Sequence, residues 1–325
     1  MINLTILFGG KSNEHDISIL SAKSIMKYIN RDKYNISLIY IDKDGEWYRC
    51  FDIEKLDGLE IIDNYNILNK ADVVFPVLHG RYGEDGTIQG LMEVLGVKYV
   101  GCGIGSSLIA MDKELTKIVL NSINIPQAKY ISVFKDNYNI NSILDIIDND
   151  IHYPIFIKPA RSGSSVGINK VYDSDGVEKC IQEAFNYDDK VIIEEYIEGR
   201  EIEVGILGND ELIISDIGEI KTSEDFYSYD SKYKNKTSKT IIPALIDDTL
   251  VYKIKACALE IYRTMECRGL ARLDFFVNKD KIIFNEINTM PGFTNISMYP
   301  MLFENIGIDY SELIDRIIEL GMGRA

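Results

Sequence analysis

Strands that alternate with helices over the first 105 residues constrain this chain more than any other feature of its sequence. Two apolar runs, "NLTILFGG" and "ISLIYID", are typical of buried strands, and the apolar residues between them recur at helical spacing from Ile19 to Ile29. A third run, "ADVVFPVLHG", precedes a helical segment and a short strand, "KYVG". This alternation predicts an open parallel sheet, whose ligands lie at the carboxyl ends of its strands. The segments "FGGKSNEHD" and "LHGRYGEDG" fall at such ends.

The pattern changes after residue 105. A helix predicted over "GSSLIAMDKELTKIVLNS" is followed by strands near 129–134, 155–158 and 167–171 and by a further helix, "VEKCIQEAFN". From "KVIIEEYIEGREIEVGIL" onward the strands look antiparallel, with one helix from about 248 to 265 between them. The predicted fold class is therefore α/β and α+β, with three domains: an N-terminal parallel-sheet domain, residues 1–105; a central domain, 106–189; and a C-terminal domain, 190–325.

Charge and cysteine content exclude several functions. The chain has 35 basic and 51 acidic residues, a net charge of −16, so we expect no nucleic acid and no anionic membrane as a partner. No apolar segment is long enough to span a membrane, and the first residues lack the features of a signal peptide. Five cysteines without CxxC spacing predict reduced thiols and a cytoplasmic location. With only three histidines, a metal site would rest on carboxylates, which favours Mg²⁺.

Polar residues inside two apolar strands are the first candidates for such a site. Asp274 lies in "RLDFF", and Glu286 and Asn288 lie in "FNEIN". If the two strands are neighbours, all three side chains share one face, because Glu286 and Asn288 are two residues apart. Three oxygen ligands on one face suit Mg²⁺ and substrate phosphates. A buried ion pair between Arg272 and a carboxylate, without a metal, is the alternative.

The loop "SGSSVG" follows Lys158 directly. It lacks the P-loop pattern and precedes a strand rather than a helix. Its backbone N–H groups could still cover phosphates, with Lys158 neutralising an oxygen. An ordinary flexible hairpin is the alternative.

Four further segments each allow a structural and a functional interpretation. "EEYIEGREIEV" is a solvated acidic edge or a site for adenine and ribose, and "NTMPGFTNISM" caps a helix near 299–305 or holds a substrate carboxylate. In "GGKSNEHDIS", Ser12 or Asn13 caps a helix with Glu14 in its first turn, or Glu14 binds a substrate ammonium. Lys113 and Lys117 are solvated helix positions, or one of them reaches a phosphate.

The order of these motifs along the chain carries a family resemblance. The series "GGKSNEHDIS", "HGRYGEDGTIQG", "MDKELTK", "KPARSGSSVG", "IEEYIEGREIEV", "FYSYDSKY", "RLDFF" and "NEINTMPGFTNISMYP" resembles the D-alanine–D-alanine ligases of the ATP-grasp superfamily. The match runs from residue 4 to beyond 310, and "HGRYGEDG" and "NEINTMPGFT" are its most specific parts. It implies a three-domain ATP-grasp fold that holds ATP between the second and third domains and makes D-Ala-D-Ala for peptidoglycan, and hence for cell-wall biogenesis and cell shape. The reaction it implies passes through a D-alanyl phosphate.

The resemblance also implies roles for residues on the ATP side. Lys113 and Lys158 match the lysines that bind phosphate, and Ser164, Ser165, Val166 and Gly167 match the phosphate loop. The adenosine site is matched by Glu194, Glu195, Ile197 and Glu201. The magnesium ligands are matched by Asp274, Glu286 and Asn288. The implied metal is two Mg²⁺ ions, with Mn²⁺ as an alternative. Glu195 departs from the family, since many relatives carry another residue there.

For the amino acids, the resemblance implies a site for each substrate and one for the reaction intermediate. Glu14 receives the ammonium of the first D-alanine, and His79 lies in the same wall. Arg272 and Gly292 form the oxyanion site, while Ser297 and Met298 hold the carboxylate of the second amino acid. The pair Leu270–Ala271 departs from the family in a way that we expect to alter packing only.

Residues 219–240 match the loop that closes over ATP in the family. Because an acyl phosphate hydrolyses in water, such chemistry requires a lid. Lys232 is then a further phosphate contact, and Tyr233 bonds towards Ser164 and Glu14. A disordered surface loop is the alternative.

Three readings compete on function. Met298 and Tyr233 favour D-alanine as the second substrate over D-serine or D-lactate, although D-serine remains open as a weaker one. A D-Ala–D-Ser ligase and a nucleotide-binding regulator without catalysis are the rivals; Arg272 at the oxyanion position argues against the regulator. The partners are D-alanine and ATP, and the family implies a homodimer.

Overall fold

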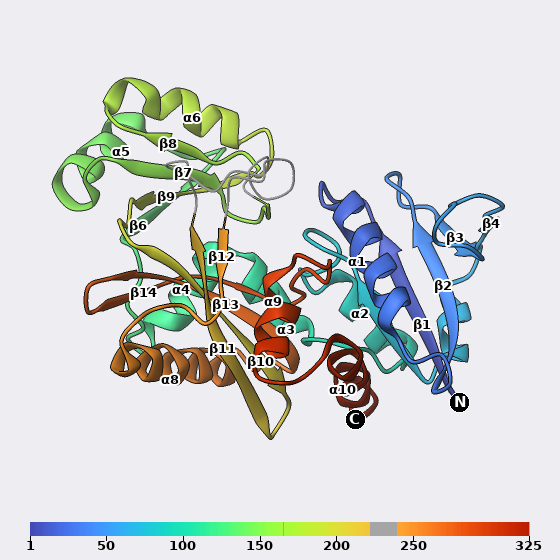
Figure 1. Ribbon diagram of the computed structural model, residues 1–325. Helices are drawn as coiled ribbons and strands as arrows, with labels where there is room; N and C mark the ends of the chain where they lie inside the picture. Colours follow the sequence, from blue (N-terminus) through green and yellow to red (C-terminus); the bar gives the residue numbers. More distant parts are fainter. Residues whose placement is uncertain (165, 222–238, 325) are drawn as a thin grey trace.

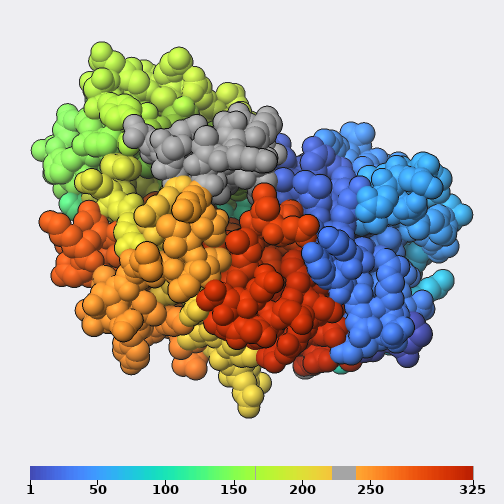
Figure 2. All heavy atoms as spheres, viewed as in Figure 1, coloured from blue at the N-terminus to red at the C-terminus, as the bar shows by residue number. Residues whose placement is uncertain are grey.

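The computed structural model describes residues 1–164, 166–221 and 239–324, and within them the chain forms three β-sheets (Figure 1). In the space-filling view, the central unit (green) lies above the C-terminal unit (orange and red), and the N-terminal unit (blue) lies beside it on the right (Figure 2). In the part of the chain described, no helix is long and apolar enough to cross a membrane.

The N-terminal sheet has the strand order β4-β3-β2-β1-β5. Its strands are β1 (Ile2–Gly9), β2 (Tyr34–Ile41), β3 (Trp47–Cys50), β4 (Glu60–Ile61) and β5 (Val73–Val77). The last six residues of β1 are all buried, as expected for a strand covered on both faces. Helices α1 (His15–Tyr28) and α10 (Tyr310–Met322) share one apolar cluster with this sheet, and α2 (Thr87–Leu95) shares another.

Two details of this sheet differ from the sequence prediction. Only β1, β2 and β5 are parallel; β3 and β4 are added antiparallel, so the sheet is mixed. Antiparallel addition needs only a short turn, and the turn at Asp42–Gly45 supplies it, with Asp42 accepting from the backbone N–H groups of Asp44, Gly45 and Glu46. The predicted strand "KYVG" is reduced to one bridge between Val74 and Tyr99.

A single helix predicted after residue 105 is two helices, α3 (Ile104–Met111) and α4 (Lys113–Asn121). Asp112 separates them because it is extended (φ −92°, ψ 104°) and its carboxylate accepts from the N–H groups of Glu114 and Leu115, both at 3.1 Å. An aspartate that caps a helix in this way favours a break over continuation. Lys190 then binds Asp112 at 2.6 Å and Glu114 at 2.8 Å, which ties α4 to the central unit.

The central sheet is antiparallel, in the order β6-β9-β7-β8. Its strands are β6 (Tyr130–Phe134), β7 (Ile155–Pro159), β8 (Asn169–Val171) and β9 (Lys190–Glu195), and α5 (Ile140–Ile146), its continuation Ile147–Ile151 and α6 (Val177–Ala184), preceded by the turn Ser174–Gly176, cover one face. From the sequence, residues 190–195 are expected to join the later strands, but β9 pairs with β6 and β7. The reason is that its apolar residues Val191 and Ile193 pack in the same cluster as β7 and α6.

The C-terminal sheet is antiparallel as predicted, in the order β12-β11-β10-β13-β14. Its strands are β10 (Arg200–Gly208), β11 (Leu212–Lys221), β12 (Lys239–Ile241), β13 (Gly269–Asn278) and β14 (Lys281–Asn288); the helices are α8 (Asp248–Thr264) and α9 (Met298–Asn305). Alternate residues of β10 and β13, such as Val204 and Leu273, pack in one cluster with α8. The intervening residues therefore face the opposite side, where the cleft lies.

Candidate active site

Two adjoining pockets occupy the cleft where the three units meet. One, of about 160 Å³, lies between the N-terminal and C-terminal units, and the other, of about 140 Å³, lies between the central and C-terminal units. We call them the amino-terminal pocket and the central pocket. Six residues line both: Lys113, Ser162, Gly163, Ser164, Glu203 and Glu286. A ligand group at this shared wall is therefore accessible from both sides.

A charged cluster on β10, β13 and β14 forms the floor of the cleft. The register sets Asp274 opposite Glu286 on one side and Glu203 on the other, and Arg272 opposite Asn288. Arg272 contacts Asp274 with Nε at 2.8 Å and Nη2 at 2.7 Å, and its Nε lies 2.8 Å from Glu203 Oε2. Burial lowers the pKa of Arg272, but Asp274 and Glu203 outweigh it and hold that pKa well above its usual value.

The three predicted metal ligands share one face of this sheet, as the sequence analysis expected. Asn288 Nδ2 lies 3.2 Å from Asp274 Oδ2. The alternative of an Arg272–Asp274 ion pair is also present, so the two interpretations coexist in one cluster. Within the described residues, no three Asp, Glu, His or Cys side chains gather as a metal site. Two carboxylates and an amide oxygen still fit a hard cation that takes its remaining ligands from phosphates and water.

Glu203 was missed by the sequence analysis. It lies in "REIEV", where Glu201 and Glu203 alternate with apolar residues, and this alternation was the available signal. The pair must face the same side of β10. Glu203 is buried at Arg272 and lines both pockets.

Three lysines converge on the central pocket. Lys117 and Lys158 both pair with the buried Glu194, with Lys117 Nζ 3.1 Å from Oε1 and Lys158 on Oε2. Burial raises the pKa of Glu194, yet the two ammonium groups outweigh it and bring that pKa to about 2. Lys113 Nζ donates to Ser162 O at 2.7 Å, and burial lowers the pKa of this lysine.

These contacts change two of the sequence expectations. Lys117 is not a solvated helix position, since it is 2% exposed and salt-bridged. Glu194 lines the pocket as expected for the adenosine site, but its carboxylate is committed to the two lysines. The remaining candidates for that site, Glu195, Ile197 and Glu201, line the same pocket, and Glu195 Oε1 accepts from Lys129 N at 2.8 Å.

The amino-terminal pocket is lined by Glu14 from the start of α1. Glu14, rather than Ser12 or Asn13, precedes the helix, and its side chain does not cap it. Its Oε1 instead accepts a hydrogen bond from Ser164 Oγ, so the carboxylate faces the cleft and joins two units. A Cβ on Gly80 or Gly163 would come within 2.6 Å of Glu14 Oε2, so both positions leave this carboxylate no room to spare.

His79 and Glu84 complete the wall from the "HGRYGEDG" loop. His79 is buried, bonds to Ser21 Oγ and Met290 O at 3.0 Å each, and has its pKa lowered by burial. Glu84 was not singled out by the sequence analysis, although its motif was. It accepts from Gly80 N at 2.6 Å and Met290 N at 3.1 Å. Burial, and then the charge of Glu14, raise the pKa of Glu84 to about 8.

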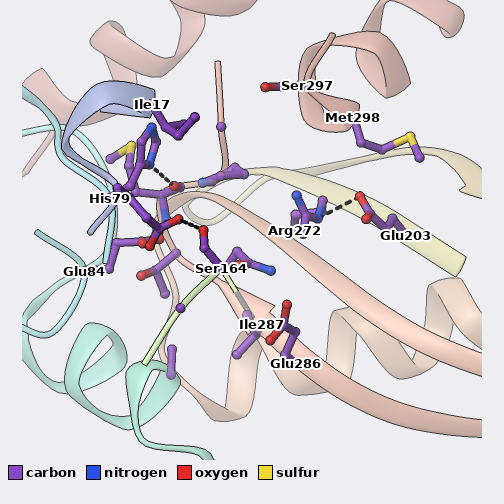
Figure 3. A pocket seen from close by; sticks show the side chains of 18 of the residues that line it. Ile17, His79, Glu84, Ser164, Glu203, Arg272, Glu286, Ile287, Ser297 and Met298 are labelled. Atoms are coloured by element: carbon purple, nitrogen blue, oxygen red, sulfur yellow. Dashed lines mark hydrogen bonds and ion pairs between the residues drawn. The ribbon is translucent and has the colours of Figure 1, made fainter. Parts of the chain in front are cut away.

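The far wall comes from the segment after β14. Figure 3 shows Arg272, Glu203 and Met298 on one side of the pocket and His79, Glu84 and Ser164 on the other. Gly292, Ser297 and Met298 all line it, and Ser297 Oγ accepts from Thr294 N at 2.9 Å. Met298 is 6% exposed at the start of α9, and a Cβ on Gly218 would meet its Sδ at 2.6 Å.

The predicted phosphate loop is only partly described. Ser164 lines both pockets, whereas Val166 and Gly167 are not among the residues that line either. Gly167 (φ +74°) lies against Tyr187 and Pro159, and the next residue, Ile168, lines the central pocket. Ser165, Lys232, Tyr233 and most of the predicted lid lie outside the described residues; the lid's ends, Glu219–Lys221 and Lys239–Thr240, are paired in β11 and β12.

Comparisons with known proteins point in one direction. Residues 3–61 and 52–102 match the family "D-ala D-ala ligase N-terminus", and residues 119–319 match "D-ala D-ala ligase C-terminus". A D-alanine–D-alanine ligase of Caldicellulosiruptor bescii is 46% identical, with 99% of this chain and 95% of that protein covered. D-alanine–D-alanine ligase B of Clostridium tetani is also 46% identical, with 99% and 94% covered.

Solved structures agree. The VanG D-Ala:D-Ser ligase of Enterococcus faecalis is 36% identical, with a TM-score of 0.89 over 98% of this chain and 99% of that one. The D-alanine–D-alanine ligase of Bacillus anthracis complexed with ATP is 26% identical, with a TM-score of 0.80 over 99% and 98%.

Proposed function

The chain belongs to the D-alanine–D-alanine ligase family, and on this premise we propose how its cleft joins two D-alanine molecules at the expense of ATP. It is an ATP-dependent ligase with the ATP-grasp fold, and its product D-Ala-D-Ala is a precursor of peptidoglycan. The assignment of individual residues to steps is the proposal. The single observation that supports it is the wall shared by the two pockets, beside Arg272.

We assign ATP to the central pocket. Glu195, Ile197 and Glu201 are proposed to contact adenine and ribose, with Glu194 acting through the lysines that it pairs. Lys113 and Lys158 are proposed to neutralise phosphate oxygens, together with N–H groups of the loop 163–167 and with Lys232. The position of Glu286 supports this, because it lines the shared wall with Lys113 and the central pocket with Lys158.

Asp274, Glu286 and Asn288 are the proposed magnesium ligands. Their oxygen donors and their common face fit Mg²⁺, and Mn²⁺ as an alternative. Bound there, the metal would supply charge neutralisation on the phosphate oxygens. We propose two ions, as the sequence resemblance implies.

Both D-alanines are assigned to the amino-terminal pocket. The first places its ammonium at Glu14, beside His79, and its carboxylate towards the shared wall. One carboxylate oxygen attacks the γ-phosphorus, the bond to ADP breaks, and D-alanyl phosphate forms. The amine of the second D-alanine, held through Ser297 and Met298, attacks the acyl carbon; the bond from that carbon to the phosphate oxygen breaks, and the phosphate leaves with its electrons and takes up the proton that the amine loses.

Arg272 and Gly292 are proposed to stabilise the oxyanion of the tetrahedral intermediate. The guanidinium brings a fixed positive charge, and the glycine brings a backbone N–H. Arg272 is already oriented by Asp274 and Glu203, so little reorganisation is needed when negative charge develops. Tyr233 is proposed to join the Ser164–Glu14 hydrogen bond when the lid closes.

Purified enzyme with Mg-ATP tests this function. Phosphate release would be measured with D-Ala, with D-Ala plus D-Ser and with D-Ala plus D-lactate, and products identified by mass. We expect D-Ala-D-Ala from D-Ala alone and a minor D-Ala-D-Ser product. The similarity to a D-Ala:D-Ser ligase makes D-serine the second candidate; a dominant mixed product at equal concentrations would assign the chain to it. Absence of amino-acid-stimulated release would overturn the catalytic assignment.

A homodimer and a cytoplasmic location are also proposals. The cysteines are all free thiols, which supports a reducing compartment. Light scattering during size exclusion tests the dimer: a mass near twice 37.0 kDa is expected, and a mass of one chain contradicts it.

A further inference from the structure

The turn Met290–Phe293 carries Gly292 from the end of β14 into the amino-terminal pocket. Both polar backbone groups of Met290 bind side chains of the N-terminal unit. Met290 N donates to Glu84 Oε1 at 3.1 Å, and Met290 O lies 3.0 Å from His79 Nδ1. A carbonyl oxygen can only accept, so Nδ1 carries the proton.

The same unit also holds the other end of the turn. Phe293 N donates to Ser21 Oγ at 3.2 Å, and Ser21 Oγ lies 3.0 Å from His79 Nε2. Burial lowers the pKa of His79, which favours the neutral ring, so with Nδ1 protonated Nε2 accepts from the Ser21 hydroxyl. Ser21 and His79 therefore form one continuous chain from α1 to both ends of the turn.

Glu84 fixes this chain to the loop that carries it. While Oε1 binds Met290, Oε2 accepts from Gly80 N at 2.6 Å. One carboxylate thus bridges two backbones whose residues are about 200 positions apart in sequence. Each of its two oxygens therefore accepts one backbone N–H, so the side chain holds the loop and the turn together through a separate hydrogen bond to each.

We propose that Glu84 is a positioning residue, which together with His79 and Ser21 sets the direction of the Gly292 N–H towards the reacting oxygen. The inference rests on the oxyanion role proposed above for Gly292. Gly292 itself has no side chain to anchor it, and a Cβ there would meet Ser297 Oγ at 2.8 Å. Its position is therefore set by its neighbours, and a displacement of about 1 Å can cost roughly 100-fold in rate.

Glu84→Gln tests the proposal. The amide oxygen can accept from one N–H, but the amide NH₂ then faces the other N–H and cannot bind it. Asp85→Asn is the matched control, because Asp85 is the next residue and, among the described residues, its carboxylate accepts from its near neighbours Tyr82 N and Thr87 N. Both variants replace one carboxylate with an amide.

The readouts are kcat, the affinity for a phosphinate dipeptide that mimics the tetrahedral intermediate, the affinity for ADP, and the thermal midpoint. We expect Glu84→Gln to lower kcat and weaken phosphinate binding by about 10- to 100-fold while ADP affinity stays unchanged. Asp85→Asn should leave phosphinate binding at the wild-type value. Equal phosphinate affinities in the two variants, or equal losses for phosphinate and ADP, would overturn the proposal.

Two further variants keep the test decisive. Ser21→Ala removes the bond to Phe293 N and should weaken phosphinate binding by less than Glu84→Gln does. Unchanged phosphinate binding in Ser21→Ala would count against the proposal. This result can be obtained even if Glu84→Gln fails to fold. Adding Glu84→Gln to Gly292→Ala should cost less than adding it to the wild type, because both act at one N–H, and full additivity contradicts this. Failure of the wild type to make D-Ala-D-Ala would instead refute the proposed function.

Discussion

The two pockets hold their charged groups in different ways. In the central pocket and the cleft floor, charges pair along strands whose register fixes them, as in Lys158–Glu194 and Arg272–Asp274. In the amino-terminal pocket, polar groups are held by loop backbone from another unit, as Glu84 is by Gly80 and Met290. The first arrangement is preorganised within one sheet, whereas the second depends on how two units meet.

We expect the largest loss of activity from a substitution of Arg272, whose position is fixed within one sheet. Arg272→Lys keeps the charge but loses the planar fork that binds Asp274 and Glu203, so we expect kcat to fall by roughly 100- to 1000-fold. Arg200→Lys is the matched control on β10, because Arg200 makes the same fork with Glu219 at 2.8 and 2.7 Å and lines neither pocket. Similar kcat losses in both variants would show that sheet stability, not oxyanion binding, is affected.

The ion pairs of Glu194 should also make the stability of the fold depend on pH in the acidic range. Because the pKa of Glu194 is about 2 in the folded protein and near 4.5 when unfolded, its contribution to the free energy of unfolding is complete above pH 4.5 and is lost as pH falls towards 2. At about 1.4 kcal/mol per pH unit, this is roughly 3 kcal/mol. Urea unfolding of wild type and Glu194→Gln should show a stability gap that narrows between pH 5 and pH 3. A constant gap would argue against the ion pairs.

Replacing Lys158 tests ATP binding in the central pocket without unfolding the protein. In Lys158→Met, Lys117 still pairs with Glu194, so we expect the fold to persist while the KM for ATP rises about tenfold to a hundredfold, the worth of a hydrogen bond to a charged group. Lys135→Met, in the same unit but outside both pockets, is the control. An unchanged KM would remove Lys158 from the phosphate site.

The smallest effect tests the amino-terminal pocket through packing alone. Gly218→Ala places a methyl group within 2.6 Å of Met298 Sδ and should push that side chain towards the cavity. Overpacking of this kind costs about 1–3 kcal/mol if nothing moves, so we expect the flexible methionine to shift and the KM of the second D-alanine to rise several-fold. Steady-state kinetics at saturating ATP measure this, and the D-Ser to D-Ala product ratio should change with it. Identical kinetics would show that Met298 does not contact the second substrate.

The difference between groups held within one sheet and groups held across two units also explains which features could be predicted from the sequence. Asp274, Glu286 and Asn288 were found together because strand periodicity dictates a common face once two strands pair. The break at Asp112 and the antiparallel edge strands β3 and β4 were missed, since a capping aspartate and a tight turn compete with patterns that otherwise favour continuation. Glu84 was missed because its partner, Met290, is brought near only by the packing of two units.

The helix break at Asp112 has a mechanical consequence. Lys113 begins α4, yet its N–H binds Ala160 O, its Nζ binds Ser162 O, and its neighbour Asp112 is salt-bridged to Lys190. All three anchors lie in β9 or in the loop after β7 of the central sheet, although Lys113 precedes every strand of that sheet in the chain. A rotation of the central unit would therefore carry Lys113 and Lys158 as one body, together with the phosphates that we propose they bind. Arg272 would stay with the opposite body, so docking of the two bodies would decide when charge neutralisation and oxyanion binding act together.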